Sequence, residues 1–304
     1  MKAILILLLF LVSVFIGCSQ NSREYKQGRA DMQYLIHHDE PGPTIKQGDF
    51  LSVHFIHRTE EDSLLASSYQ LDQPTFLEHV KPVFKGDIFD GLALLSEGDS
   101  ATFKLNFDSM QTALNVMKPL TTKSNTLYFT VKVEKVISKG NLSNSVFEDE
   151  VSRFYQENAL KSMKEEPGKL GKYIALHKLK PEVTPSGLKY IIVRKGSGPS
   201  ARKGDSVKFK YTGMLAATGK VFISNNSDTV KKYGYIFQES ERFIPSKVAT
   251  GSGTIIPGLD EALLLFPKGT KATLIIPSKL AYGGNGQNIG LPPYAPLIFE
   301  IEII

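Results

Sequence analysis

The sequence predicts an α+β protein made of two copies of one fold, each an antiparallel β-sheet curled over a short α-helix, with a helical linker between them. Two observations predict this: an internal repeat relating the halves of the chain, and strand-like alternation followed by a short helical pattern. At 304 residues, 41% hydrophobic and 22% charged, the chain has the length and composition of about two globular domains.

The repeat is seen when the second half is laid over the first. Five residues recur 156 positions later (190 − 34): Tyr34, Gly42, Pro43, Gly48 and Asp49 recur as Tyr190, Gly198, Pro199, Gly204 and Asp205. Further on, Gly98–Phe103 matches Gly269–Leu274 at an offset of 171, and Leu127–Phe129 matches Leu297–Phe299 at 170. Insertions in surface loops account for the change of offset, because loops tolerate added residues.

Each copy contains a strand pattern. In Val207–Tyr211, three apolar residues alternate with two lysines, as in a strand with one buried face, and Val53 and Phe55 occupy the corresponding places in the first copy. A short helix is predicted between Pro257-Gly258 and Pro267. Its apolar residues at helical spacing are Leu259, Ala262, Leu263 and Phe266.

Residues 140–182 lie between the two copies, have a helical pattern instead of strand-like alternation, and are predicted to form a helical linker. Ser145 and Glu148 form a capping-box pattern, Pro167-Gly168 is expected to end that helix, and a second helix is expected from Leu170 to Leu179. The apolar stripe of the first helix consists of Phe147, Val151, Phe154 and Tyr155. The stripe can pack on a neighbouring domain, or it can form a dimerisation or client-binding arm.

The N-terminus carries a secretory pattern. The apolar run Ile4–Ile16 is shorter than the ~20 residues that span a bilayer and is typical of a signal peptide. It ends in Phe15-Ile-Gly-Cys18, which resembles a bacterial lipoprotein cleavage box, and Cys18 is the only cysteine. We therefore expect a signal at 1–17, lipid on Cys18, and a polar tether at 18–30, although an ordinary secretory signal with an incidental thiol is the alternative.

Three blocks near the C-terminus carry a family resemblance. They are Gly253-Thr-Ile-Ile-Pro-Gly-Leu-Asp260, Ile276-Pro-Ser-Lys-Leu-Ala-Tyr-Gly283 and Gly290-Leu-Pro-Pro-Tyr294, followed by the apolar strand Leu297–Ile304. In this order and spacing they resemble the FKBP-type peptidyl-prolyl cis-trans isomerases, over about Thr184–Ile304. The resemblance implies that residues 183–304 form an isomerase domain that binds proline-containing chains in an apolar bowl, without metal or cofactor.

The resemblance also implies the residues of the bowl. Tyr211 and Phe222 correspond to its aromatic walls, and Phe299 corresponds to the aromatic floor. The residues implied to hold the substrate carbonyl are Ile255 and Ile256, of which the second offers its backbone N–H, and Tyr282, which offers its hydroxyl. Further substrate-binding residues implied by the resemblance are Val248, Leu259 and Leu291.

The chain departs from the family at several of these places. Ile223 follows the wall phenylalanine, where the family usually has an aspartate that accepts a hydrogen bond from the neighbouring tyrosine. Val248 and Leu259 stand where phenylalanine and tryptophan are common. The segment Ser224–Ile244 is longer than in compact members and is either a lid over the bowl or a packed surface loop; its aromatic residues are Tyr233, Tyr235, Phe237 and Phe243.

The first copy, expected at residues 31–139, lacks the Ala-Tyr-Gly block. Asn106–Met110 stands in its place, His54–His57 replaces the Tyr-Thr-Gly strand, and its helix begins near Asp87 or Gly91. A degenerate copy of this kind is expected to be a binding or spacer domain.

Other function classes are disfavoured. The net charge is +5, but no basic run with interleaved aromatics indicates a nucleic-acid site. His54 and His57 lie three apart on a predicted strand and so face opposite sides, which excludes joint chelation of one metal ion.

The leading hypothesis is a lipid-anchored prolyl isomerase of the cell envelope that acts on unfolded or extracytoplasmic proteins and possesses no cofactor, with a homodimer through the linker helix as an option. The rival hypothesis is a non-catalytic chaperone or envelope interaction lipoprotein that retains the fold.

Overall fold

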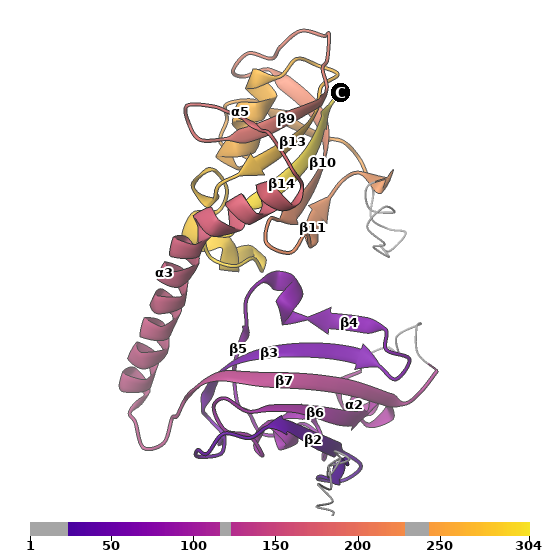
Figure 1. The fold of residues 1–304 in the computed structure, drawn as a ribbon, viewed down its shortest axis with the longest axis vertical. Helices are drawn as coiled ribbons and strands as arrows, with labels where there is room; N and C mark the ends of the chain where they lie inside the picture. Colours follow the sequence, from indigo (N-terminus) through magenta and orange to yellow (C-terminus); the bar gives the residue numbers. More distant parts are fainter. Residues whose placement is uncertain (1–23, 116–122, 229–242) are drawn as a thin grey trace, which may run out of the picture.

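The computed structural model describes residues 24–115, 123–228 and 243–304. These residues form two seven-stranded antiparallel sheets, joined by the long helix α3 (Asn144–Leu176). Figure 1 shows the first sheet at the bottom in indigo to magenta, and the second at the top in orange to yellow, with α3 running between them. The predicted fold class, two α+β units joined by a helical linker, is confirmed.

The first half of the chain contains β1 to β7. Its sheet has the order β1-β2-β6-β7-β3-β4, and β5 pairs with β3. The strands are β1 (Lys26–Gln27), β2 (Gln33–His38), β3 (Phe50–Thr59), β4 (Leu64–Ser67), β5 (Thr75–Glu78), β6 (Ser100–Asn106) and β7 (Thr126–Ile137). The short helices are η1 (Ser68–Leu71), α1 (Ile88–Leu92) and α2 (Phe107–Leu114).

The second half contains β8 to β14. Its sheet has the order β8-β9-β13-β14-β10-β11, and β12 pairs with β10. The strands are β8 (Glu182–Val183), β9 (Lys189–Arg194), β10 (Ser206–Leu215), β11 (Val221–Ser224), β12 (Ser246–Ala249), β13 (Lys271–Ile276) and β14 (Leu297–Ile303). The helices described here are α5 (Pro257–Leu265), η2 (Ser278–Leu280) and η3 (Gly283–Ile289). Strand for strand, this is the order of the first sheet, so the sequence repeat is also a repeat of topology.

Helix α5 covers the inner face of the second sheet. Leu259 and Leu263 of α5 belong to one apolar cluster with Phe209 of β10 and Phe299 of β14. The alternation predicted for β10 is present at its start, where Val207 and Phe209 are buried and Lys208 between them is exposed. The inner face therefore carries the larger core of this half, and the outer face carries the smaller one.

The C-terminal half of α3 covers the outer face of the same sheet. Leu170 is buried in a second cluster with Met214, Ile275 and Ile298, which are neighbours in one row across β10, β14 and β13. Figure 1 shows this part of α3 lying across the sheet. Because both faces are covered here, the middle strands are buried on both sides and their apolar residues run consecutively instead of alternating.

The linker is a single helix, so the predicted break at Pro167-Gly168 is wrong. α3 runs for 33 residues with Pro167 inside it. Proline removes one backbone hydrogen bond, but packing of Leu170 and its neighbours against the second sheet holds the following turns in place. The N-cap is Ser143, whose hydroxyl accepts from the Val146 N–H, and not Ser145. Among the described helices, none is both long and apolar enough to cross a membrane.

The N-terminal half of α3 packs on the first sheet. Phe154 meets Phe50 and Phe76 edge to face, with ring centroids 5.7 Å apart in both pairs. Tyr155 meets the same two rings at 5.6 and 5.1 Å. Such aromatic pairs add ~1 kcal/mol each to the burial of their surface. Two residues of the predicted apolar stripe, Phe154 and Tyr155, thus pack on the first sheet.

We predict that Phe154→Ala destabilises the full chain by about 2–3 kcal/mol, because it removes the ring that lies between Phe50 and Phe76. Urea-induced unfolding measures the change. Leu160→Ala, on the same helix but at a side chain that is 50% exposed, is the control and is expected to cost less than about 0.5 kcal/mol. Equal losses in the two variants would contradict the packing described.

Candidate active site

A cavity of about 460 Å³ opens on the inner face of the second sheet, between β10, β14 and the N-terminus of α5. It is lined by Phe209, Tyr211, Ile223, Ser246, Val248, Thr254, Ile255, Ile256, Pro257, Leu259, Ala281, Tyr282 and Phe299. Its volume and mainly apolar lining are those of a site for a small molecule or a few residues of a peptide.

The floor of the cavity is Phe299, which pairs across the strands with Gly213 of β10. A Cβ atom at Gly213 would lie 2.8 Å from the Phe299 ring and 2.8 Å from the Ile223 side chain. Only glycine therefore lets the ring lie against the β10 backbone. The Phe222 ring meets the Phe299 ring edge to face at 6.0 Å, and the Tyr211 ring lies 6.1 Å away.

The wall residue Tyr211 is held through its backbone by Asn225. The Tyr211 N–H donates to Oδ1 of Asn225 at 2.6 Å, and the Asn225 N–H donates to the Tyr211 carbonyl at 3.1 Å. Asn225 is 8% exposed, and its amide group also donates to the Phe209 carbonyl. Asn225 was not identified as a site residue in the sequence analysis. The sign of it in the sequence is that asparagine, a residue common in turns, directly follows β11.

Two hydrogen-bond donors border the cavity. Ile256 is the N-cap residue of α5 and supplies no side-chain cap, and within the described part of the chain no group accepts from its backbone N–H. The second donor is the Tyr282 hydroxyl. Burial, and secondarily the nearby Tyr211, raise the pKa of Tyr282 above its ordinary value, so the phenol remains protonated and able to donate at neutral pH.

The structure gathers most of the residues that the resemblance implied. Tyr211, Ile255, Ile256, Tyr282, Phe299, Val248 and Leu259 all line the cavity. Phe222 and Leu291 do not: Phe222 supports the floor by packing on Phe299, and Leu291, 2% exposed, lies in the surrounding core. Lining residues not anticipated as site residues are Phe209, Ile223, Ser246, Thr254, Pro257 and Ala281.

Of the departures from the family pattern, Ile223 lies at the rim of the cavity and Leu259 is buried beneath it. Ile223 is 40% exposed and lines the cavity, so an apolar side chain stands where a carboxylate was expected from the family. The question of a lid in Ser224–Ile244 lies largely outside the described residues, since 229–242 are not described. Cys18 also lies outside them.

Comparisons with known proteins agree with this geometry. Residues 198–304 match the family described as FKBP-type peptidyl-prolyl cis-trans isomerase. FK506-binding protein 1B of Aspergillus fumigatus is 35% identical over 119 residues, which are 39% of this chain and 92% of that protein. The chain belongs to the FKBP-type peptidyl-prolyl cis-trans isomerases.

Bacterial relatives are similar over part of their length. The FKBP-type 22 kDa peptidyl-prolyl cis-trans isomerase of Escherichia coli is 35% identical over 121 residues, 40% of this chain and 50% of the relative. The outer membrane protein MIP of Legionella longbeachae is 34% identical over 148 residues, 47% of this chain and 55% of the relative. The chain thus spans about half the length of these two relatives. The crystal structure of FkpA from Escherichia coli is 27% identical and covers 55% of this chain and 74% of FkpA, with a TM-score of 0.39.

The first half of this FKBP-type chain fills the place of the cavity with its own side chains. His57 of β3 pairs with Phe129 of β7 as Gly213 pairs with Phe299 in the second half. The His57 ring stacks on the Phe129 ring at 3.8 Å, so an imidazole occupies the space above the floor. Burial lowers the pKa of His57 from 6.5 to about 4, and the ring is therefore neutral at pH 7.

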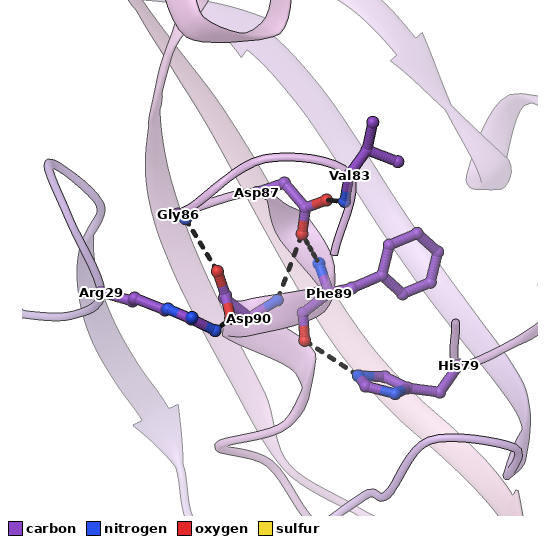
Figure 2. Close-up of polar contacts among 7 residues, drawn as sticks. All are labelled: Arg29, His79, Val83, Gly86, Asp87, Phe89 and Asp90. Carbon is purple, nitrogen blue, oxygen red and sulfur yellow. Dashed lines mark hydrogen bonds and ion pairs between the residues drawn. The ribbon is translucent and has the colours of Figure 1, made fainter. Parts of the chain in front are cut away.

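The helix N-terminus of the first half is occupied as well. The Asp87 carboxylate caps α1 by accepting from the Phe89 and Asp90 N–H groups at 2.8 and 3.3 Å. It also accepts from the Val83 N–H at 2.7 Å, and Figure 2 shows Asp87 between these segments. The helix begins after Asp87, which resolves the alternatives left by the sequence. The first half thus caps its helix with a carboxylate, whereas Ile256, the N-cap residue of α5 in the second half, supplies no side-chain cap.

We predict that the first half loses stability as the pH falls from about 6.5 to 4. The folded-state pKa of His57 is lowered, so the unfolded chain takes up the proton first and the stability is complete only above the unfolded pKa. Discounted for partial exposure, the loss between pH 7 and pH 5 is about 1 kcal/mol. Urea midpoints at the two pH values measure it.

In His57→Phe, which keeps a planar ring on Phe129, this part of the pH dependence should be absent, whereas in His38→Gln, at an exposed histidine, it should persist. Identical pH profiles for the native protein and His57→Phe would refute the assignment to His57.

Proposed function

We propose that the chain is a peptidyl-prolyl cis-trans isomerase that rotates X-Pro bonds of unfolded or extracytoplasmic proteins in the cavity of its second half. One observation carries the proposal: an apolar cavity with an aromatic floor is bordered by an open backbone N–H at Ile256 and a protonated hydroxyl at Tyr282. Membership of the FKBP-type family supports the same reaction.

The cavity suits the chemistry of the amide bond. Rotation of a peptide bond meets a barrier of about 18–20 kcal/mol, and X-Pro bonds isomerise over tens to hundreds of seconds unaided. Twisting the bond removes its resonance and reduces the charge separation that water stabilises. An apolar site therefore disfavours the planar form more than the twisted form, which is differential binding of the transition state. The Ile256 N–H and the Tyr282 hydroxyl would hold the carbonyl that precedes the proline while the prolyl ring lies over Phe299.

The first half has a different role in this proposal. The His57 ring fills the space above Phe129 that a substrate would need, so this half serves as a binding or spacer domain beside the isomerase domain. Residues 140–182 connect the two. Homodimerisation through α3 would use residues such as the exposed Leu160 and Met163, since Phe154 and Tyr155 face the first sheet.

We further propose an envelope location with a lipid anchor on Cys18. The apolar run Ile4–Ile16 and the Phe15-Ile-Gly-Cys18 box support it, and one relative is named an outer membrane protein. Lipid on Cys18 would attach the domains to the membrane through the tether at 18–30.

The rival function, a non-catalytic chaperone or envelope interaction protein, is favoured by Ile223, which removes the expected carboxylate from the rim. An isomerisation assay with the full chain and a proline-containing peptide separates the two. Acceleration supports the enzyme, and its absence with a correctly folded protein supports the rival.

We predict that Phe299→Ala lowers kcat/KM for peptide isomerisation at least tenfold, equivalent to about 1.4 kcal/mol of transition-state stabilisation. The matched control is Phe129→Ala, because Phe129 has the same place in the first sheet, where His57 fills the space above it. Its kcat/KM should remain within about twofold at temperatures where the variant is folded. Comparable losses in both variants would remove the cavity from the mechanism.

We predict that Cys18→Ser abolishes incorporation of a labelled fatty acid when the chain is produced in a bacterial host, because the thiol is the only attachment point of its kind in the sequence. Isomerase activity of the purified variant should be unchanged, since residues 198–304 carry the family match. Labelling that persists in Cys18→Ser would disprove lipidation at this site.

A further inference from the structure

The linker helix α3 contacts the loop that carries Tyr282. Glu166 of α3 accepts two hydrogen bonds from Ser278: the backbone N–H donates to Oε1 at 2.5 Å, and the hydroxyl donates to Oε2 at 2.7 Å. Ser278 is 3% exposed, so both bonds are shielded from water on its side. Hydrogen bonds to a carboxylate are stronger than those between neutral groups, and two of them fix an orientation as well as a distance.

The hydrogen bonds from Ser278 to Glu166 lie at the start of helix η2, whose own N-cap residue provides no side-chain cap. Ser278 opens the short helix η2, and Pro277 before it supplies no side-chain hydrogen bond. Glu166, 112 residues earlier in the sequence, therefore takes the role of the cap. The rest of the turn follows from Ser278, because the Ala281 N–H donates to the Ser278 carbonyl at 2.9 Å and Tyr282 comes next.

The same turn of α3 is also tied to the first half. Lys169, three residues after Glu166 and hence on the same side of the helix, forms an ion pair with Asp72 at 2.5 Å. The Lys169 side chain is only 19% exposed. Glu166 thus projects from a helical turn that is fixed by packing on the second sheet through Leu170 and by an ion pair to the first half.

We propose that Glu166 is a positioning residue of the isomerase site: it holds the segment Ser278–Tyr282 so that the Tyr282 side chain borders the cavity. The inference rests on the proposed function for its effect on activity. It extends the site beyond the family-matched residues 198–304, because the residue that orients the loop belongs to the linker. The linker helix is then a part of the isomerase site and not only a spacer.

The first experiment compares three variants of the full chain at a temperature at which each is folded. Glu166→Ala should lower kcat/KM about 10- to 100-fold, because a displacement of about 1 Å in a positioned group can have that effect. Glu166→Gln, which retains an oxygen acceptor for the Ser278 N–H, should recover most of the loss. Glu165→Ala removes a neighbouring carboxylate that forms a longer ion pair with Lys169, at 3.5 Å, and should be within about twofold of the native protein.

Hydrogen exchange provides a measurement that does not depend on activity. In Glu166→Ala, amides in residues 278–282 should exchange at least tenfold faster, whereas those in β13 and β14 should keep their native rates. Unchanged exchange in this segment would overturn the proposal even if activity fell. Should the full chain show no isomerase activity, the proposed function fails and the exchange rates still decide whether Glu166 holds the loop.

A double-mutant comparison separates positioning from general stability. In a Tyr282→Phe background, Glu166→Ala should have little further effect on kcat/KM, because the group that it positions has lost its hydroxyl. Equal fold losses in the native and Tyr282→Phe backgrounds would show that Glu166 does not act through Tyr282. If Glu166→Ala does not fold, Ser278→Ala replaces it, since that variant removes only the hydroxyl bond to Glu166.

Discussion

The cavity depends on the close approach of the Phe299 ring to the β10 backbone. Strand pairing places Gly213 directly across from Phe299, so that a side chain at position 213 would point to the same inner face as the Phe299 ring. Because a Cβ atom at Gly213 would lie 2.8 Å from the ring, any side chain at that position would force the ring out of its place on the cavity floor. The same pairing in the first sheet carries His57, and there the space is filled. This cross-strand position is therefore one difference between the copy that has the cavity and the copy in which the space is filled.

The second difference between the two copies lies at the start of the helix. A helix start without a capping side chain is less stable than a capped one by about 1 kcal/mol. Helix α5 lacks such a cap, because its N-cap residue is Ile256, whereas the Asp87 carboxylate caps helix α1. At both places the first copy uses a side chain of its own, His57 above Phe129 and Asp87 at the start of α1, where the second copy has none. Small local changes on one scaffold are sufficient to separate a structural copy from a functional one.

Much of the fold and of the site could be predicted because their signals are local or repeated. The repeat indicates two sheets of one topology, and the blocks around Ile256, Tyr282 and Phe299 lie on short segments whose order fixes their meeting point. The break predicted at Pro167 was wrong because helix propensity is a local property, while the helix is continued by packing of Leu170 on a distant sheet. Asn225 and Glu166 could not be predicted from the sequence, because their hydrogen-bond partners Tyr211 and Ser278 lie 14 and 112 residues away and no repeating pattern connects them.

The continuity of α3 also bears on the order in which the protein is made. The N-terminal half of the helix finds Phe50 and Phe76 already synthesised when it emerges from the ribosome. Leu170, by contrast, must wait for Ile298, 128 residues later (298 − 170), before its cluster is complete. At a synthesis rate of about 5–20 residues per second, that interval is several seconds to half a minute. During it the first half can be folded while Leu170 and its apolar neighbours on the last turns of the helix still lack the sheet on which they pack.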